Sequence, residues 1–291
     1  MPTPQDDRVL LVPIGCGKCF ECMKQKKRNW QIRLMEEIKC HKIMHYVTMT
    51  FSEESIMELT PDIELTNENN DIDNAIATLA MRRFLERWRK KYRKSLRHWM
   101  VTELGHENTE RIHLHGIIFG GDKLEIERIW KYGHVKFGEY VNLKTINYIV
   151  KYINKVDLDH KGYVSKILTS AGIGSNYMKR SDHRLNKYNG TNTDTTYKSN
   201  NGYKMAQPMY YRNKIWTDEE RELLWLHMLD KNERYIMGEK VDISNGEDDY
   251  YTILEEAREK NKRLGYGDNS KNWSKEEYQK KEQRFTQKEI S

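Results

Sequence analysis

The order of apolar patterns between residues 44 and 156 is the feature that most constrains the fold. Short runs rich in β-branched and aromatic residues alternate with runs whose apolar residues recur at helical spacing. The order is strand, helix, strand, strand, helix, strand, then one more helix. This is the split βαβ pattern, which predicts an α+β protein (α/β in the broad sense) with a mainly antiparallel sheet and flanking helices. The expected strands are Met44–Phe51, His98–Leu104, Ile112–Gly120 and Tyr132–Val141, and the expected helices are Asn74–Lys94, Lys123–Lys131 and Thr145–Val156.

The remaining segments are less regular. Residues 53–73 hold eight acidic groups and no basic one, so we expect a surface loop there, and residues 169–214 are rich in Gly, Ser, Asn, Thr and Tyr and are also expected to be loop. A helical C-terminal extension follows, opened by a capping box of Thr217 and Glu220, with helices expected over Thr217–Leu229 and near 251–263. We therefore divide the chain into a Cys-rich basic segment (1–43), a core (44–168), a loop-rich segment (169–214) and an acidic, partly helical tail (215–291).

Charge is distributed unevenly along the chain. The formal net charge is +6, but residues 215–291 carry 14 Lys+Arg and 19 Asp+Glu, a net of −5, which leaves 36 basic and 25 acidic groups, a net of +11, for residues 1–214. A basic body indicates a polyanionic partner such as a nucleic acid. A charged fraction of 32% also suits an ordinary solvated surface, so charge alone leaves both interpretations open.

Composition also bears on location. The mean hydropathy is −0.92, and no apolar run approaches the roughly 20 residues that a membrane helix needs. The opening MPTPQDDR lacks the pattern of a secretory signal, and four cysteines are too few for a disulfide framework at this length. We expect a cytoplasmic protein without a membrane partner.

His113 and His115 are the most specific chemical feature of the core. Alternate side chains of a strand share a face, so both imidazoles point to the same side of the sheet. If residues 105–111 form the turn of a hairpin, Glu103 lies opposite His113 and Val101 opposite His115, although a slip of one residue would remove Glu103 from that face. Two imidazoles and a carboxylate suit a divalent metal ion. The alternative is a pair of ordinary half-buried histidines.

The last helix of the core carries Tyr148 and Tyr152, which lie four residues apart and therefore share a face. Each is followed three residues later by a lysine, Lys151 or Lys155. A phenol is a poor nucleophile unless a metal or cation assists it, and lysines can stabilise a phosphate or a developing phenolate. Surface tyrosines without a task are the alternative. The two tyrosines and two lysines face away from the core, because the opposite side of the helix carries an aliphatic stripe that already packs into the core. The stripe consists of Ile146, Ile149, Val150, Ile153 and Val156.

Two basic stretches, residues 24–33 and 82–97, are candidates for DNA contact. The second holds nine Lys and Arg against one acid, Glu86, with aromatic residues between them. Cations contact phosphates and aromatic rings stack on unpaired bases, whereas the alternative is that the rings are core and the cations a solvated face. The residues expected to bind DNA are Lys26, Lys27, Arg28, Arg82, Arg83, Arg87, Arg89, Lys90 and Lys91.

Near the N-terminus, Cys16, Cys19 and Cys22 have the spacing C-x₂-C-x₂-C. Three thiols at this spacing suit structural Zn²⁺ if a fourth ligand completes the site. The alternative is three reduced cysteines in a turn near the start of a helix. Candidates for the fourth ligand are Cys40, His41 and His45.

With these motifs together, the sequence resembles the HUH (His-hydrophobic-His) endonucleases, specifically the replication initiators of gokushovirus-like Microviridae, which are small single-stranded DNA phages. The resemblance covers roughly residues 13–215, although Met-Tyr-Tyr at 209–211 replaces the more usual Pro-Arg-Tyr-Tyr of those proteins. The residues that carry it are HLHG at 113–116, the YxxxY pair at 148–152 followed by Lys155, YVTMTF at 46–51, VPIGCGKCFECMKQKKRNWQIR at 12–33 and AQPMYYRNKI at 206–215.

The resemblance implies rolling-circle replication. His113 and His115, with Glu103 as third ligand, would hold Mg²⁺ or Mn²⁺ against the scissile phosphate of a single-stranded viral origin. Tyr148 or Tyr152 would attack it, leaving a 5′-phosphotyrosyl link and a 3′-hydroxyl for the host DNA polymerase, with a host helicase as a further partner in the host bacterial cytoplasm. Lys151 and Lys155 would position the phosphate or a metal-bound water. The alternatives are a non-catalytic DNA-binding or packaging protein, and an HUH transposase or relaxase.

Overall fold

The computed structural model describes residues 15–63, 72–105, 110–155, 157, 160, 163–199, 202–237 and 239–266. Its centre is a five-stranded antiparallel sheet in the order β4-β1-β3-β2-β5. With helices on both faces of this sheet, the predicted α+β class is confirmed. The strands are β1 (Met44–Met49), β2 (Arg97–Leu104), β3 (Ile112–Phe119), β4 (Val135–Phe137) and β5 (Ile167–Thr169).

The register of the central hairpin is the one predicted from the sequence. β2 and β3 pair Glu103 with His113 and Val101 with His115. On its other side β3 pairs with β1, which sets Thr48 opposite His115. Gly116 occupies a point of close approach between strands, because a Cβ there would lie 2.1 Å from the carbonyl oxygen of Trp99. The hairpin therefore holds its histidines in a tightly paired, central part of the sheet.

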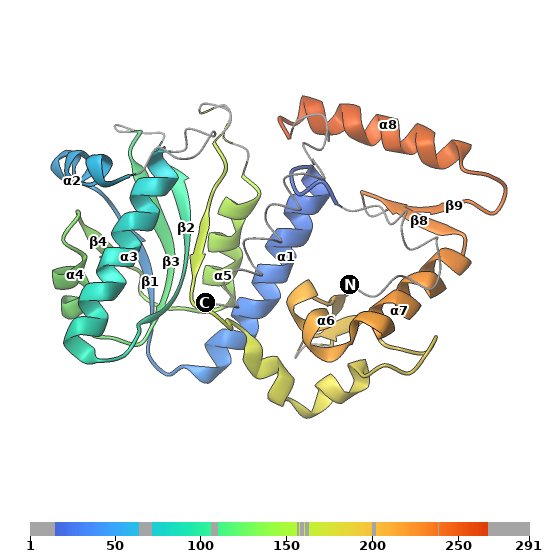
Figure 1. The fold of residues 1–291 in the computed structure, drawn as a ribbon, viewed down its shortest axis with the longest axis horizontal. Helices are drawn as coiled ribbons and strands as arrows, with labels where there is room; N and C mark the ends of the chain where they lie inside the picture. Colours follow the sequence, from blue (N-terminus) through green and yellow to red (C-terminus); the bar gives the residue numbers. More distant parts are fainter. Residues whose placement is uncertain are drawn as a thin grey trace, which may run out of the picture.

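One face of the sheet is covered by α3 (Ile72–Tyr92) and α4 (Lys123–Trp130) (Figure 1). Leu114 of β3 points to this side and packs with Phe84 and Trp130 of these helices in the larger hydrophobic core. Asp122 caps α4, its side chain accepting a hydrogen bond from the backbone N–H of Glu125. Because His113 and His115 alternate with Leu114, they point to the opposite face.

That opposite face is covered by α1 (Phe20–Glu37), α5 (Leu143–Ile149) and the 3₁₀ turn η4 (Val150–Ile153), which continues α5 directly (Figure 1). We call α5 and η4 together the tyrosine helix. Its aliphatic side packs against Trp99 and Val101 of β2 in a second hydrophobic core. The sheet thus separates two cores, and the tyrosine helix lies on the histidine side.

Several predicted segments have different boundaries in the structure. The segment 53–73, expected to be a loop, begins with α2 (Glu53–Leu59) and the turn η3 (Thr60–Asp62), because Ser52 caps α2 and Leu59 packs into the core; residues 64–71 lie outside the described part. The strand expected over Tyr132–Val141 is confined to β4, where pairing with β1 extends over three residues.

The tyrosine helix begins at Leu143, two residues earlier than predicted. Asn142 caps it, since its side chain accepts hydrogen bonds from the N–H groups of Lys144 and Thr145. After Ile149 the helix tightens into η4, and Val156, expected at its end, lies outside the described residues.

The segment 169–214 is more ordered than its composition predicts. Three buried tyrosines of the segment pack with Ile32 of α1 and hold the segment against that helix: Tyr177, Tyr197 and Tyr211. Tyr177 and Tyr211 stack with ring centroids 4.6 Å apart. Composition cannot register such long-range contacts. The elements are η5 (Ser175–Lys179), η6 (Ser181–Asn186), β6 (Thr196–Lys198), β7 (Lys204–Ala206) and α6 (Met209–Ile215).

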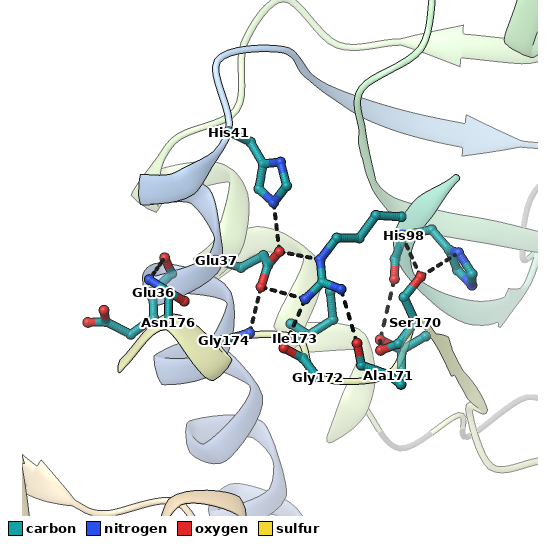
Figure 2. Close-up of polar contacts among 12 residues, drawn as sticks. Glu36, Glu37, His41, His98, Ser170, Ala171, Gly172, Ile173, Gly174 and Asn176 are labelled. Carbon is teal, nitrogen blue, oxygen red and sulfur yellow. Dashed lines mark hydrogen bonds and ion pairs between the residues drawn. The ribbon is translucent and has the colours of Figure 1, made fainter. Parts of the chain in front are cut away.

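Glu37, at the end of α1, ties this segment to the sheet (Figure 2). Its carboxylate accepts hydrogen bonds from Arg97 of β2 and from the backbone N–H of Gly174, the latter at 2.6 Å, and it bonds His41 at 2.7 Å. The Glu37 side chain is only 5% exposed. Burial raises the pKa of the Glu37 carboxyl, but the bonds from Arg97, Gly174 and His41 outweigh burial and lower the pKa overall.

The C-terminal extension contains two predicted helices and a hairpin. The capping box of Thr217 and Glu220 is present at the start of α7. The last helix folds back to the start of α1, where the buried Asn261 side chain accepts a hydrogen bond from the backbone N–H of Phe20 at 2.8 Å. Across the described ranges, no helix is long and apolar enough to cross a membrane. The elements are α7 (Asp218–Asp230), β8 (Glu233–Ile236), β9 (Glu239–Asp242) and α8 (Asp248–Arg263).

Candidate active site

Glu103 and His115 form the centre of the candidate site on the histidine side of the sheet. Glu103 Oε2 lies 3.0 Å from His115 Nε2, and Glu103 Oε1 accepts a hydrogen bond from Lys155 Nζ at 2.7 Å. The Glu103 and His115 side chains are 16% and 12% exposed. Burial raises the pKa of Glu103, but the bonds from His115 and Lys155 outweigh it and lower the pKa, so the carboxylate is ionised at neutral pH.

The His115 ring is fixed on two further sides. Its Nδ1 lies 3.1 Å from Thr48 Oγ1 on β1. Its face stacks on the Tyr152 ring, with centroids 4.6 Å apart and planes at 11°. The His113 ring lies beyond it, 6.4 Å between centroids. Burial lowers the pKa of His113 and favours the neutral imidazole, which is the form that binds metals.

The two tyrosines contact each other as well as the histidines. Tyr152 Oη donates a hydrogen bond to Tyr148 Oη at 2.9 Å, and the rings are perpendicular. Tyr148 is 46% exposed, whereas Tyr152 is half-buried. Burial, the bond to Tyr148 and the charge of Glu103 raise the pKa of Tyr152. Tyr148 is therefore accessible from solvent, whereas the half-buried phenol of Tyr152 holds its proton more tightly than a free tyrosine does.

The two lysines take different positions. Lys155 binds Glu103, as described above, while Lys151 Nζ lies 5.7 Å from the centroid of the Tyr148 ring. Both lysines are exposed. The predicted division of the tyrosine helix holds within the described residues, since its aliphatic side is buried at Ile146, Ile149, Val150 and Ile153.

Two residues of β1, Thr48 and Tyr46, belong to the site and were not among the sequence-predicted residues. Thr48 contacts His115, and the Tyr46 ring packs edge-on against Tyr148 with centroids 6.2 Å apart. The alternation of β1 places both on one face. That signal alone could not identify them, because the pairing of β1 with β3 spans more than sixty residues and has no short turn to fix its register.

The distance between two of the predicted ligands, His115 and Glu103, suits both a direct ion pair and a shared divalent ion. Neighbouring ligand atoms around Mg²⁺, each about 2.1 Å from the ion in octahedral geometry, lie about 3.0 Å apart. His115 Nε2 and Glu103 Oε2 have this separation, at 3.0 Å. His113 shares the face but does not converge with them: among the described residues, only the three N-terminal cysteines bring three ligand atoms within 4.8 Å of one another. The donor types fit a divalent ion, and His113 must turn toward His115 to complete the set.

The basic residues of α3 lie across the sheet from the tyrosines, on the side of the larger core. Arg87, one of the residues expected to bind DNA, donates hydrogen bonds to the carbonyls of Ile129 and Trp130 and lies over the Tyr132 ring. Its guanidinium therefore secures the end of α4. Arg82, Arg83 and Lys91 pair with Glu86, Asp62 and Glu125, whereas Arg89 and Lys90 are exposed.

The basic stretch of α1 lies on the tyrosine side. Gln31 of α1 donates a hydrogen bond to Asn147 of the tyrosine helix at 2.7 Å. Lys27 and Arg28 lie four and three residues before Gln31, hence on the same helical face, and are half-buried. Lys26 is exposed. Of the two predicted stretches, only this one borders the candidate active site.

The candidates for a fourth cysteine-site ligand are far from the cysteines. Cys16, Cys19 and Cys22 lie at the start of α1, whereas Cys40, His41 and His45 follow its end, about 27 Å away for 18 helical residues. His41 is bonded to Glu37, and His45 to the carbonyl of Gly121 at 2.9 Å. These three expected ligands are therefore excluded.

Comparison with known proteins gives one result. Residues 44–157 match the model of a protein family described as replication-associated protein ORF2/G2P. The matched range starts at the first residue of β1 and ends beyond the tyrosine helix, so it contains Glu103, both histidines and both tyrosines. No curated protein and no solved structure matches the chain. The match supports a replication initiator and a role in DNA replication.

Proposed function

We propose that this protein is an HUH-type endonuclease that starts rolling-circle replication by nicking and rejoining single-stranded DNA at a viral origin. The observation that carries the proposal is the stack of Tyr152 on His115, which brings the tyrosine pair to the histidine–carboxylate cluster. The family match over the same residues agrees with it.

The ion that suits these donors is Mg²⁺ or Mn²⁺, which His115 and Glu103 would hold together with His113 once the His113 ring turns toward them. When bound, such an ion supplies Lewis-acid polarisation of a phosphoryl oxygen. Lys155, which pairs with Glu103, limits the negative charge near the phosphate, and Lys151 lies beside the exposed tyrosine. These side chains orient the substrate so that a phenol oxygen stands in line with the scissile bond.

The reaction is a transesterification. A tyrosine Oη forms a bond to phosphorus, the bond from phosphorus to the 3′ oxygen breaks, and the proton lost by the phenol is balanced by one gained at the 3′-hydroxyl. The products are a 5′-phosphotyrosyl link and a 3′-hydroxyl primer for the host DNA polymerase. The second tyrosine repeats the cut after one round of synthesis, and the released 3′-hydroxyl then attacks the first link and closes the circle. In this proposal the protein is encoded by a gokushovirus-like phage. It acts in the host bacterial cytoplasm together with a helicase of the host.

Single-stranded oligonucleotides that tile the encoding genome, incubated with the protein and Mn²⁺, test the proposal. We expect one of them to be cut with formation of a covalent protein–DNA adduct on a denaturing gel. The double variant Tyr148→Phe, Tyr152→Phe should form none, whereas Tyr140→Phe, which changes another exposed tyrosine, should behave like the wild type. Salt-sensitive binding without cutting by the wild type would instead support a non-catalytic DNA-binding or packaging protein.

A further inference from the structure

The three N-terminal cysteines converge on one point. Their Sγ atoms all lie within 4.8 Å of one another, and those of Cys16 and Cys22 are 3.9 Å apart. Tetrahedral Zn²⁺ with Zn–S bonds of about 2.3 Å places neighbouring sulfurs about 3.8 Å apart. A disulfide requires about 2.05 Å, and none of the four cysteines forms one. The separation of Cys16 and Cys22 therefore suits two thiolates on a common ion, and without an ion it suits a hydrogen bond from the Cys16 thiol to Cys22.

The backbone of this turn is arranged for sulfur acceptors. Cys16 Sγ accepts from the N–H groups of Lys18 and Cys19, at 3.5 and 3.1 Å, and Cys19 Sγ accepts from the N–H of Cys22 at 3.5 Å. The turn passes through Gly17, whose φ of +76° suits glycine. N–H groups directed at sulfur stabilise the negative charge of a thiolate, the ligand form of cysteine.

The turn is also tied to the rest of the molecule. Phe20, the first residue of α1, donates its N–H to the buried Asn261 and packs edge-on against the ring of Tyr266. The Tyr266 hydroxyl in turn donates to the carbonyl of Asn154, one residue beyond the tyrosine helix, at 2.9 Å. A rigid turn before Phe20 would fix the point at which α1, the C-terminal extension and the tyrosine helix meet.

We propose that Cys16, Cys19 and Cys22 bind one Zn²⁺ ion through three thiolates and lock this junction. A water molecule would take the fourth position of the tetrahedron, because among the described residues no fourth side chain joins the group. The site is structural and distinct from the divalent ion of the nicking reaction. Because none of the three cysteines takes part in the proposed nicking reaction, the zinc site can be tested independently of the proposed function.

Zinc content and thiol protection test the site on the full-length protein. We expect about one Zn²⁺ per chain by elemental analysis in the wild type and in Cys40→Ser, the control that removes the exposed cysteine outside the group. Cys19→Ser should lose the ion. Absence of zinc from wild-type protein purified with zinc present, or equal zinc in Cys19→Ser, would overturn the site.

A second measurement needs no variant, so it holds even if Cys19→Ser does not fold. Alkylation of the native wild-type protein, followed by intact mass, should modify Cys40 alone when zinc is bound, and all four cysteines after chelation. Equal modification before and after chelation, or a mass loss indicating a disulfide among Cys16, Cys19 and Cys22, would contradict the proposal. DNA nicking is assayed separately, so failure of the nicking proposal is distinguishable from failure of the zinc site.

Discussion

His115 is held by side chains from three elements that are distant in sequence. Thr48 of β1 contacts its Nδ1, Glu103 of β2 contacts its Nε2, and Tyr152 of η4 stacks on its ring. A histidine ligand is commonly oriented through the ring nitrogen that does not bind the metal. Thr48 is therefore a positioning residue for His115 in the proposed mechanism.

Replacing Thr48 by valine tests this role, because valine keeps the β-branched shape and removes the hydroxyl. We expect the variant to fold and to need a higher Mn²⁺ concentration for half-maximal nicking, by about 10-fold or more, as for other partners of metal ligands. Thr48→Ser should restore the wild-type metal dependence. The measurement is nicking rate against metal concentration, and an unchanged dependence in Thr48→Val would refute the assignment.

For single residues, the sequence predicted contacts across a short hairpin turn and missed contacts between residues that are far apart in the chain. The pairing of Glu103 with His113 followed from the length of one hairpin loop, and the structure confirms it. The contact of Glu103 with Lys155 could not be predicted in this way. Helical spacing predicts the side of the helix on which a lysine lies, but not the residue that it contacts. Thr48 was missed for the same reason, since its partner strand is remote in the chain.

Among the elements, α1 and α3 are both basic but lie on opposite sides of the sheet (Figure 1). Composition made both stretches candidates for DNA contact, but it could not predict on which side of the sheet each helix would lie. Packing decides it, since α1 contacts the tyrosine helix through Gln31 whereas α3 covers Leu114. DNA bound for nicking at the tyrosines should therefore pass α1.

Two matched double variants test this assignment. Lys27→Gln, Arg28→Gln removes two charges from α1, and Arg89→Gln, Lys90→Gln removes two from the exposed surface of α3. We expect the α1 variant to bind single-stranded DNA more weakly and to flatten the slope of log K against log salt by about 0.7 for each phosphate that the protein no longer neutralises. In the α3 variant, the affinity for single-stranded DNA and the slope against salt should both change far less. Equal effects in the two variants would contradict a path along α1.

For the whole molecule, Glu37 joins α1, the sheet and residues 170–174 (Figure 2). The segment 169–214 was expected to be loop, because strands of three residues and 3₁₀ turns leave little periodicity in a sequence. Its order comes from buried contacts with α1, including Tyr197 and Arg180 on Glu36. A pattern search along the chain cannot find structure of this kind.

The ionised Glu37 predicts how stability depends on pH. Its folded-state pKa is lowered below the ordinary value of 4.5, so the unfolded chain takes up the proton first as pH falls. The stabilisation is complete well above pH 4.5 and is lost as pH falls through the lowered folded-state pKa. In Glu37→Gln this part of the pH dependence should disappear, and losing the charged hydrogen bonds to the partly exposed Arg97 should cost about 1.5–3 kcal/mol near pH 7.

Thermal unfolding of the wild type and of Glu37→Gln between pH 7 and 3 checks this prediction. The two melting temperatures should differ most at neutral pH and approach each other in acid. Glu53→Gln removes a carboxylate from an exposed ion pair with Arg111 and should follow the wild type closely. A constant difference between Glu37→Gln and the wild type at every pH would contradict the assigned charge.

The covalent link to DNA is the most direct test of the central claim, that the tyrosines beside His115 cut DNA. The adduct formed with Mn²⁺ and the origin oligonucleotide is digested with protease and nuclease, and the peptide that keeps a nucleotide is sequenced by mass spectrometry. We predict a nucleotide on Tyr148 or Tyr152, transferred to the remaining tyrosine when either one is changed to phenylalanine. A nucleotide on any other residue, or cleavage without a linked peptide, would contradict the account.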